Sequence, residues 1–416
     1  MSVEANDGFA MSTQSGRQLI KMKKPFEDLL VIELTTYWAA TSAGRYLRSQ
    51  GARVIKVEAP PTGDSVRSFG RTCRTPHTDN ENPIHDLSNG GKECIALNLK
   101  DADDRAFFDK LLAKADVFIT STRMSGLKKL GLSYDDLKEK YPRLIMAHVT
   151  GWGMSGPMSN LPGLDAVSFF GINGLLSDNL MVEGGITCPI TGMGDFTTGG
   201  FLDIGILTAL YNRDRTGKGD YVMTSLYGVG GWVSANCSIG TQYYNPWPRN
   251  KGTQSPMSQA YMCSDGKYVQ LFVNEYEKYW GVFVDAFNIQ DLRNDERVNT
   301  RVAVNNPEYC KLLADRCHAS AAQQTSEELL GKLRAGGIPS VILGKFSDKY
   351  TIPDQIQHNL ANGYLVEHTY DGEGASGKTI YVNQFPMYFE SQGVVDNYEP
   401  CHAFDQDGDA IRKEFG

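Results

Sequence analysis

A single aspartate among glycines is the residue of this sequence with the clearest potential for chemistry. Asp195 stands in the run ITGMGDFTTGG of residues 190–200, and the apolar residues 201–210 that follow predict a buried helix. Free N–H groups and the helix dipole at such a helix start favour an ionised carboxylate. An ionised aspartate can cap the helix, with Thr197 and Thr198 as further caps, bind a cation, or act as a nucleophile. Local sequence leaves these roles open.

Composition limits the classes of function. The chain has 416 residues, of which 41% are hydrophobic and 22% are charged, and its net charge is −8. This length allows two domains with separate cores. The negative charge argues against broad binding of nucleic acids or anionic membranes, because both need positive potential. No apolar run is long enough to span a bilayer, so we expect a globular protein that binds neither nucleic acid nor membrane.

The cysteines indicate the expected compartment. The eight cysteines form no CxxC pair, and the seven histidines are scattered. This pattern favours reduced thiols in a cytoplasmic protein over a disulfide framework or a zinc site, and we predict no bound metal. Residues 1–25 lack the apolar core of a signal peptide and are predicted to form a disordered lead-in.

Strands and helices that alternate are expected to position the aspartate. Apolar, β-branched residues 29–34 predict a strand, residues 39–50 have helical spacing, and residues 53–58 predict a second strand. Such a unit implies parallel pairing with a right-handed crossover. His148 is expected to be a satisfied core histidine of a later strand. The alternation continues to about residue 230, through expected strands at 94–99, 116–120 and 144–149.

A dinucleotide-binding protein is one alternative, because Glu58 lies roughly 20 residues after the turn that ends the first strand. That turn lacks the glycine-rich sequence of such proteins. Tyr37 and Trp38 are too bulky there for a pyrophosphate to approach the backbone closely. The chain also has no Walker-type loop. A dehydrogenase and an NTPase therefore lose most of their support.

The second half of the chain predicts a smaller domain and a return to the first. Residues 245–252 carry prolines and a glycine and mark a linker, which an expected strand at 267–273 and charged helices to about residue 335 follow. Residues 336–339 are expected to begin the return. We predict an α/β fold with three parts: a Rossmann-like large domain with a parallel sheet at 26–235, a smaller α+β domain at 250–335 and a return segment at 340–416.

Several motifs, taken in order, resemble the family III CoA-transferases of the CaiB/BaiF type. They are VIELT at 31–35, GARVIKVE at 51–58, TGWG at 150–153, GLD at 163–165, GD at 194–195 and RTGKG at 215–219. Each motif alone is weak, whereas the ordered set is specific. The resemblance implies ring-shaped subunits in an interlocked homodimer, and an enzyme that transfers CoA from an acyl-CoA to a carboxylic acid.

The resemblance also implies that Asp195 is the nucleophile. A carboxylate in this role attacks an acyl-CoA thioester to form an anhydride, and CoA then passes to an acceptor acid through an aspartyl-CoA thioester. Four nearby glycines are expected to admit the thioester and to offer N–H groups to an oxyanion: Gly192, Gly194, Gly199 and Gly200.

CoA is a substrate in such enzymes, and no tightly bound cofactor is implied. By resemblance, Trp38 and Ala39 lie near the pantetheine arm, and Ala59 lies near the adenosine. The further contact positions are Leu97, Lys100, Ser121, Thr122, Arg123 and Lys129. Of these, Lys100, Arg123 and Lys129 are the expected partners of the phosphates.

Two departures from related enzymes bear on the substrate. Trp38 replaces a glutamine of formyl-CoA transferase and suggests a different acyl pocket. Leu164 replaces the histidine of α-methylacyl-CoA racemases, which argues against racemisation because that reaction needs two proton-transferring groups. Residues 37–40, 138–142 and 161–165 look closest to the 2-hydroxyacid branch, whose members act on phenyllactate or 2-hydroxyisocaproate in amino-acid fermentation. A racemase or epimerase of the same superfamily and a non-catalytic CoA-binding protein remain as alternatives.

Overall fold

The computed structural model describes residues 24–179, 181–182, 185–186, 189–243, 255–390 and 398–416. The chain divides into two compact units. Unit 1 comprises residues 1–172, 189–230 and 359–416, and unit 2 comprises residues 173–188 and 231–358. Of the predicted lead-in, only residues 24 and 25 are among those described, and the predicted linker at 245–252 lies outside them.

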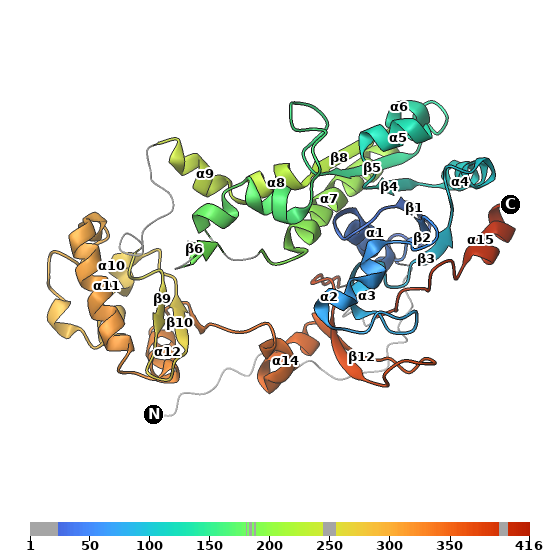
Figure 1. Cartoon of the computed structure of the whole chain (residues 1–416). Coiled ribbons are helices and arrows are strands. Elements are labelled where there is room, and N and C mark those ends of the chain that lie inside the picture. The colour runs from blue at the N-terminus through green and yellow to red at the C-terminus, as the bar shows by residue number, and fades with distance from the viewer. Residues whose placement is uncertain (1–23, 180, 183–184, 187–188, 244–254, 391–397) are drawn as a thin grey trace. The chain divides into compact units, whose positions relative to one another are not determined.

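A six-stranded parallel sheet forms the centre of unit 1 (Figure 1). All its pairings are parallel, and Val31 lies opposite Val54 on one side and Val117 on the other. Continuous apolar runs suit strands that are buried on both faces, which confirms the predicted parallel α/β architecture. In spatial order the strands are β3 (Glu93–Ala96), β2 (Arg53–Glu58), β1 (Leu30–Leu34), β4 (Val117–Thr120), β5 (Ile145–Thr150) and β8 (Tyr221–Ser225).

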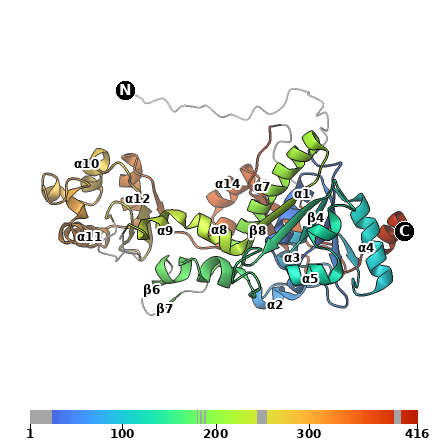
Figure 2. The same ribbon diagram turned by 90° about the horizontal axis from the view of Figure 1, so that it is seen from above.

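Helices cover both faces of this sheet. One face packs against α4 (Ala102–Lys114), α5 (Met124–Leu130), α6 (Tyr134–Leu137) and the C-terminal α15 (Gly408–Phe415). The other face carries α1 (Ala39–Ser49), α3 (Pro83–Asn89) and α7 (Met193–Thr216). The long helix α7 runs beside α1 and β8 (Figures 1 and 2).

Helix α7 contains the apolar run that predicted a buried helix. The prediction of a helix is confirmed, but α7 is buried on one side only, since the side chain of Ile204 is 61% exposed. Its buried side includes Leu202, Ile206 and Ala209. The exposed side follows from the fold, because α7 packs on β5, β8 and α1 along one face alone.

Unit 2 contains an antiparallel sheet in the order β11-β10-β9 and three longer helices. Its core includes Tyr261, Phe283, Leu313 and Leu329. The strands are β9 (Ala260–Met262), β10 (Tyr268–Leu271) and β11 (Ser340–Ile342), and the helices are α10 (Tyr276–Ala286), α11 (Pro307–Ala321) and α12 (Ser326–Ala335).

The return to unit 1 comes later than predicted. Residues 336–339 lead into β11, which completes the sheet of unit 2 beside β10. The chain stays in unit 2 as far as His358 and rejoins unit 1 from Asn359. The remaining α-helices and strands are α2 (Gly70–Cys73), β6 (Met181–Val182), β7 (Gly185–Ile186), α8 (Leu226–Val233), α9 (Ala235–Thr241), α13 (Asp348–Thr351), α14 (Pro353–Ala361), β12 (Leu365–Thr369) and β13 (Thr379–Asn383). Among the described residues, no helix has the length and apolar character needed to cross a membrane.

Candidate active site

Asp195 lies in the first turn of α7. The helix begins after Gly192, whose φ of 85° lies in the left-handed region that favours glycine. Gly192 has no side chain to cap the helix, and the hydroxyl of Thr197 donates to the carbonyl of Met193 at 2.7 Å instead of capping. The capping role that local sequence allowed for Asp195 is therefore wrong, and another role has to explain this carboxylate.

A second buried carboxylate, Asp165, lies close to Asp195. The two residues are 7% and 8% exposed. Asp165 begins a π-helical segment, Asp165–Gly171, and its oxygens accept the N–H groups of Ala166 at 2.6 Å and Gly192 at 2.7 Å. These bonds hold the π-helical segment against the start of α7. They also fix a negative charge beside the candidate nucleophile.

Burial and the charge of Asp165 raise the pKa of Asp195 from 3.8 to about 7. Burial is the larger cause, because the charged form loses its hydration. The sequence predicted that the helix start would keep this carboxylate ionised, and the two opposing effects outweigh that dipole. Asp195 is therefore poised to change protonation state near neutral pH. Its ionised form is more basic than an ordinary aspartate, which suits a nucleophile.

Two glycines of α7 allow unusually close packing around this turn. A Cβ atom on Gly194 would lie 2.6 Å from the ring of Phe169. A Cβ atom on Gly199 would lie 2.7 Å from the carbonyl oxygen of Ala39. Gly199 therefore lets the N-terminus of α1 approach α7 directly, which brings Ala39 next to the helix that carries Asp195.

The glycines offer fewer N–H groups to an oxyanion than the sequence predicted. Gly192 is not available, because its N–H already binds Asp165. Gly200 faces open space and has no packing role. The N–H groups of Gly194 and Asp195 lie in the first helical turn, where acceptors within the helix are missing. These two groups are the better candidates for stabilising negative charge on a reacting carbonyl.

An aromatic cluster of Trp38, Phe69 and Phe196 lies beside the start of α7. The Trp38 ring stacks on Phe196, with centroids 6.2 Å apart, and meets Phe69 edge-on at 4.8 Å. Its six-membered ring also faces Gly192, where an added Cβ would come within 3.1 Å. Trp38 is 5% exposed, and its indole N–H has no hydrogen-bond partner among the described residues. A buried donor without a partner is costly, so an oxygen of a bound ligand would relieve it.

The turn that carries Trp38 is held by hydrogen bonds to two neighbouring loops. Tyr37 has a φ of 61°, which is uncommon for a residue other than glycine. Its N–H donates to Asp64 Oδ1 at 3.1 Å, and the N–H of Thr36 donates to Ser121 Oγ at 3.1 Å. The turn is therefore fixed from the loops that follow β2 and β4.

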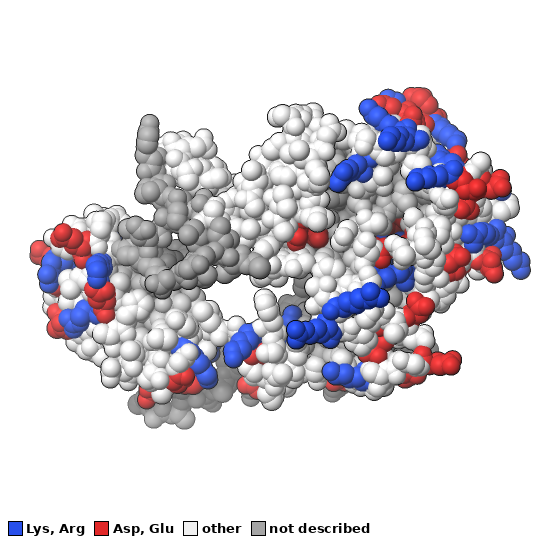
Figure 3. All heavy atoms as spheres, viewed as in Figure 1, with Lys and Arg blue, Asp and Glu red and all other residues white. Residues whose placement is uncertain are grey.

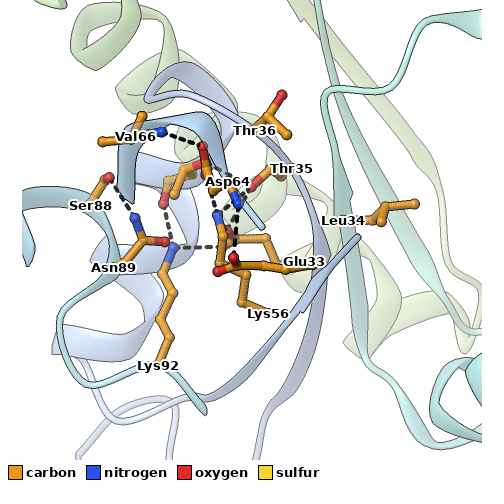
Figure 4. A network of polar contacts seen from close by, with 12 residues as sticks. Glu33, Leu34, Thr35, Thr36, Lys56, Asp64, Val66, Ser88, Asn89 and Lys92 are labelled. Carbon is orange, nitrogen blue, oxygen red and sulfur yellow. Dashed lines mark hydrogen bonds and ion pairs between the residues drawn. The ribbon is translucent and has the colours of Figure 1, made fainter. Parts of the chain in front are cut away.

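Asp64 itself belongs to a buried charge network below the turn (Figure 4). Lys56 Nζ lies 2.9 Å from Asp64 and 3.2 Å from Glu33, and Lys92 Nζ lies 2.7 Å from Glu33. All four side chains are almost fully buried. Two cations and two carboxylates balance each other there, as buried charges require.

The residues expected to bind CoA follow the carboxyl ends of four neighbouring strands. Since those ends share one edge of a parallel sheet, the positions lie along one edge, where open α/β sheets bind their ligands. Trp38 and Ala39 follow β1, Ala59 follows β2, Leu97 and Lys100 follow β3, and Ser121, Thr122 and Arg123 follow β4.

Individual contacts differ along this edge. The side chain of Leu97 belongs to the core under α4 and is 1% exposed, so this residue can meet a ligand only through its backbone. Lys100, Arg123 and Lys129 are exposed. Lys129 lies in the last turn of α5, and Lys and Arg side chains are interspersed with Asp and Glu side chains over α5 and α6 at the upper right of Figure 3. Its contact with a phosphate stays a prediction.

His148 is confirmed as a core histidine. It is fully buried, its Nε2 donates to the carbonyl of Thr122 at 2.9 Å, and its Nδ1 accepts the hydroxyl of Tyr221 at 2.8 Å. Burial lowers its pKa to about 4, so the ring is neutral at physiological pH. A satisfied neutral ring of this kind has a structural role.

A hollow of unit 1 that lies away from this site is lined in part by arginines. It measures about 690 Å³ and opens beside the amino ends of β2 and β3, near Arg48 and Arg53. Arg48 already pairs with Glu399 at 2.6 Å, and Arg53 pairs with Glu93 at 2.7 Å. Since its cations are already paired, this hollow is a poor candidate for binding a polyanion.

Sequence reasoning missed three groups of this site. The GLD motif includes Asp165 but indicates no role for it, and no motif points to Phe69 or Phe196. No local pattern places Asp165 beside Asp195, because a long stretch of chain separates them. The aromatic residue directly after Asp195 was the one available signal for the cluster.

Comparisons with known proteins identify the family of this chain. The model of CoA-transferase family III matches residues 26–405. The chain is 32% identical over 399 residues to (R)-2-hydroxy-4-methylpentanoate CoA-transferase of Clostridioides difficile, covering 94% of this chain and 95% of that relative. It is also 32% identical over 398 residues to cinnamoyl-CoA:phenyllactate CoA-transferase of Clostridium sporogenes, covering 94% and 93%.

A solved structure shows the same fold. A CaiB/BaiF family protein from Brucella suis superposes with a TM-score of 0.77 at 26% identity, covering 95% of this chain and 100% of that one. The match includes the parallel sheet and extends over nearly the whole of both chains. With the family model spanning most of its length, this chain belongs to CoA-transferase family III.

Proposed function

We propose that Asp195 is the nucleophile of this CoA-transferase and that the acid which receives CoA is a 2-hydroxy acid. One observation carries the assignment of the nucleophile. Asp195 is a nearly buried carboxylate with a pKa of about 7, in a helical turn whose N–H groups lack intrahelical acceptors.

The first half of the reaction moves CoA onto the protein. A carboxylate oxygen of Asp195 attacks the carbonyl carbon of the acyl-CoA thioester, the C–S bond breaks, and an aspartyl-acyl anhydride and CoA thiolate result. The thiolate then attacks the aspartyl carbonyl of the anhydride. This step forms an aspartyl-CoA thioester and releases the donor acid as a carboxylate.

The second half repeats these steps in reverse order. The acceptor carboxylate attacks the aspartyl-CoA thioester, which gives a second anhydride and frees the thiolate. The thiolate attacks the acceptor's carbonyl carbon, forms the new acyl-CoA and returns Asp195 as a carboxylate. No net proton or electron is gained or lost, and the thioester bond energy is conserved, so no ATP is needed.

Burial of Asp195 matters for both anhydrides, because water hydrolyses them readily. The carboxylate is 8% exposed, and the neighbouring Trp38 is 5% exposed. The same exclusion of water strengthens the hydrogen bonds from the first turn of α7 to the charged tetrahedral intermediates.

The choice of a 2-hydroxy acid rests on two relatives. Both are named for transfer to or from 2-hydroxy acids, and each covers more than nine-tenths of this chain. The leucine at position 164 supports transfer over racemisation, since a leucine cannot exchange a proton. The interlocked homodimer and a part in amino-acid fermentation remain predictions from the family resemblance, and the cytoplasmic location remains a prediction from the cysteine pattern.

Trapping of the intermediates tests the proposal. The purified protein is incubated with cinnamoyl-, isocaprenoyl-, succinyl- or acetyl-CoA and then with hydroxylamine or borohydride, and the peptides are analysed by mass spectrometry. We expect modification at Asp195 and none in Asp195→Asn. Undiminished turnover in that variant would remove the nucleophile assignment and favour a different centre. Absence of transfer to every 2-hydroxy acid in a panel would remove the acceptor class.

A further inference from the structure

Several apolar side chains and one charged side chain lie near the start of α7, which carries Asp195. The aromatic cluster of Trp38, Phe69 and Phe196 packs against Gly192. Further apolar side chains are exposed in the two segments that Asp165 ties together: Leu164, Val167, Ile190 and Met193. A ligand beside Asp195 therefore meets hydrocarbon from unit 1.

The one charge that acts on Asp195 from the described residues is negative. It belongs to Asp165, whose oxygens bind two N–H groups and which therefore stays in place. A second carboxylate on the substrate, if placed there, would be repelled by Asp165. It would also lose its hydration without gaining a cation among these residues, and a buried unpaired charge is among the most expensive arrangements in a protein.

An apolar side chain on the substrate, unlike a second carboxylate, would gain free energy from burial at this site. Trp38 is 5% exposed and fixed between Phe69 and Phe196, so it holds the Phe196 ring as a rigid surface that needs no ordering when a ligand binds. Phe196 is still 39% exposed, and a ligand's aryl or branched alkyl group would cover part of it. Aromatic rings and branched chains gain most from such a surface, through burial and stacking.

We propose that Trp38, stacked on Phe196, determines specificity for the acid: it selects 2-hydroxy acids with a bulky apolar side chain over 2-hydroxy acids with a second carboxylate. The inference rests on the proposed function. It assigns to Trp38 a role in choosing the acyl group, in addition to its expected place near the pantetheine arm.

The test compares acids that differ in the side chain alone. Phenyllactate and 2-hydroxy-4-methylpentanoate are compared with malate and 2-hydroxyglutarate, each as acceptor from the same acyl-CoA, and kcat/KM is measured for each. All four carry the 2-hydroxyl, so the comparison leaves the 2-hydroxy class itself untouched. For the wild-type chain we expect the apolar acids to be favoured by about 100-fold, within the range that differences in apolar side chains supply.

Variants then assign the preference to Trp38. Trp38→Gln, which brings in a polar amide, is expected to lower the ratio of apolar to dicarboxylic acids by about tenfold or more. Trp38→Phe keeps an apolar ring and is expected to hold the ratio within about threefold. Trp232, which is 70% exposed in α8, supplies the matched control: Trp232→Gln should leave the ratio unchanged. Thermal melting of each variant shows that it is folded.

The outcomes separate this inference from the function on which it rests. If the wild-type chain transfers no CoA to any acid, or if transfer does not need Asp195, the proposed function is overturned. Transfer that needs Asp195 but serves malate as well as phenyllactate overturns the inference alone, even if Trp38→Gln does not fold. An unchanged ratio in folded Trp38→Gln likewise overturns the role of Trp38.

Discussion

The protonation of Asp195 makes a prediction about the pH dependence of transfer. The nucleophile must be ionised, and its pKa is about 7. About one-tenth of the free enzyme is then active at pH 6 and about nine-tenths at pH 8, so kcat/KM for the acyl-CoA should rise roughly tenfold over this interval. An ordinary aspartate would be fully ionised throughout and would give no such rise.

Removal of the charge of Asp165 should move this rise in a known direction. Asp165→Asn keeps an oxygen to accept the N–H of Gly192 and removes the negative charge that disfavours ionisation of Asp195. The pKa of Asp195 lies about 3 units above its ordinary value, and Asp165 is the smaller of two causes. Its share is therefore less than half, so the rise should shift to lower pH by at most about 1.5 units.

The assay is the initial rate of transfer at subsaturating acyl-CoA between pH 5 and 9, for the wild-type chain and for Asp165→Asn. The phosphate of CoA also titrates near pH 6, but its titration is the same in both proteins. The difference between the two profiles therefore belongs to the protein. A profile that does not move, or that moves to higher pH, would refute the reasoning that Asp165 acts on Asp195 through its charge.

Three further predictions concern stability and packing. Because the pKa of Asp195 is raised in the folded chain, its buried charge destabilises the fold increasingly from about pH 4 to about pH 7. Asp195→Asn should therefore abolish transfer, yet raise the free energy of unfolding, measured with denaturant, by about 1–4 kcal/mol at pH 8. Near pH 4 the free energy of unfolding should not change. Gly199→Ala should lower both stability and activity, as melting and initial rates would show, because the new Cβ lies 2.7 Å from the carbonyl of Ala39. Lys92→Met should cost about 3 kcal/mol in denaturant unfolding, since Glu33 loses a buried cation at 2.7 Å; a cost near zero would mean that Lys56 suffices.

Local patterns predicted the first elements of unit 1 to within one residue. The expected strand at 29–34 is β1 (Leu30–Leu34), and the expected helix at 39–50 is α1 (Ala39–Ser49). Both follow from neighbouring residues, because β-branched apolar runs and helical spacing are local signals. The expected strand at 94–99 is shorter, as β3 (Glu93–Ala96), because pairing with β2 ends where β2 itself ends, at Glu58. Strand lengths are therefore set by partners that the local sequence does not reveal.

The candidate site was predictable in part, through the family resemblance. That resemblance pointed to Asp195 and to loops after four strands, and the fold places those loops along one edge of the sheet. The protonation state of the nucleophile was not predictable. Its pKa depends on burial and on Asp165, and both arise from packing between segments far apart in the chain. The dipole of a helix start, which local sequence does show, was the weaker influence.

The buried charges under the turn connect the fold to the site. Glu33 and Lys56 lie at buried positions of β1 and β2, and replacement of such groups by apolar residues often costs little stability. Here the network does more than balance charge, because Asp64, held by Lys56, accepts the N–H of the strained Tyr37 and so fixes the turn that places Trp38. An uncommon backbone conformation such as that of Tyr37 persists when several surrounding interactions fix it. An apolar core at these positions would preserve the sheet, yet it would remove the anchor that sets Trp38 beside the start of α7.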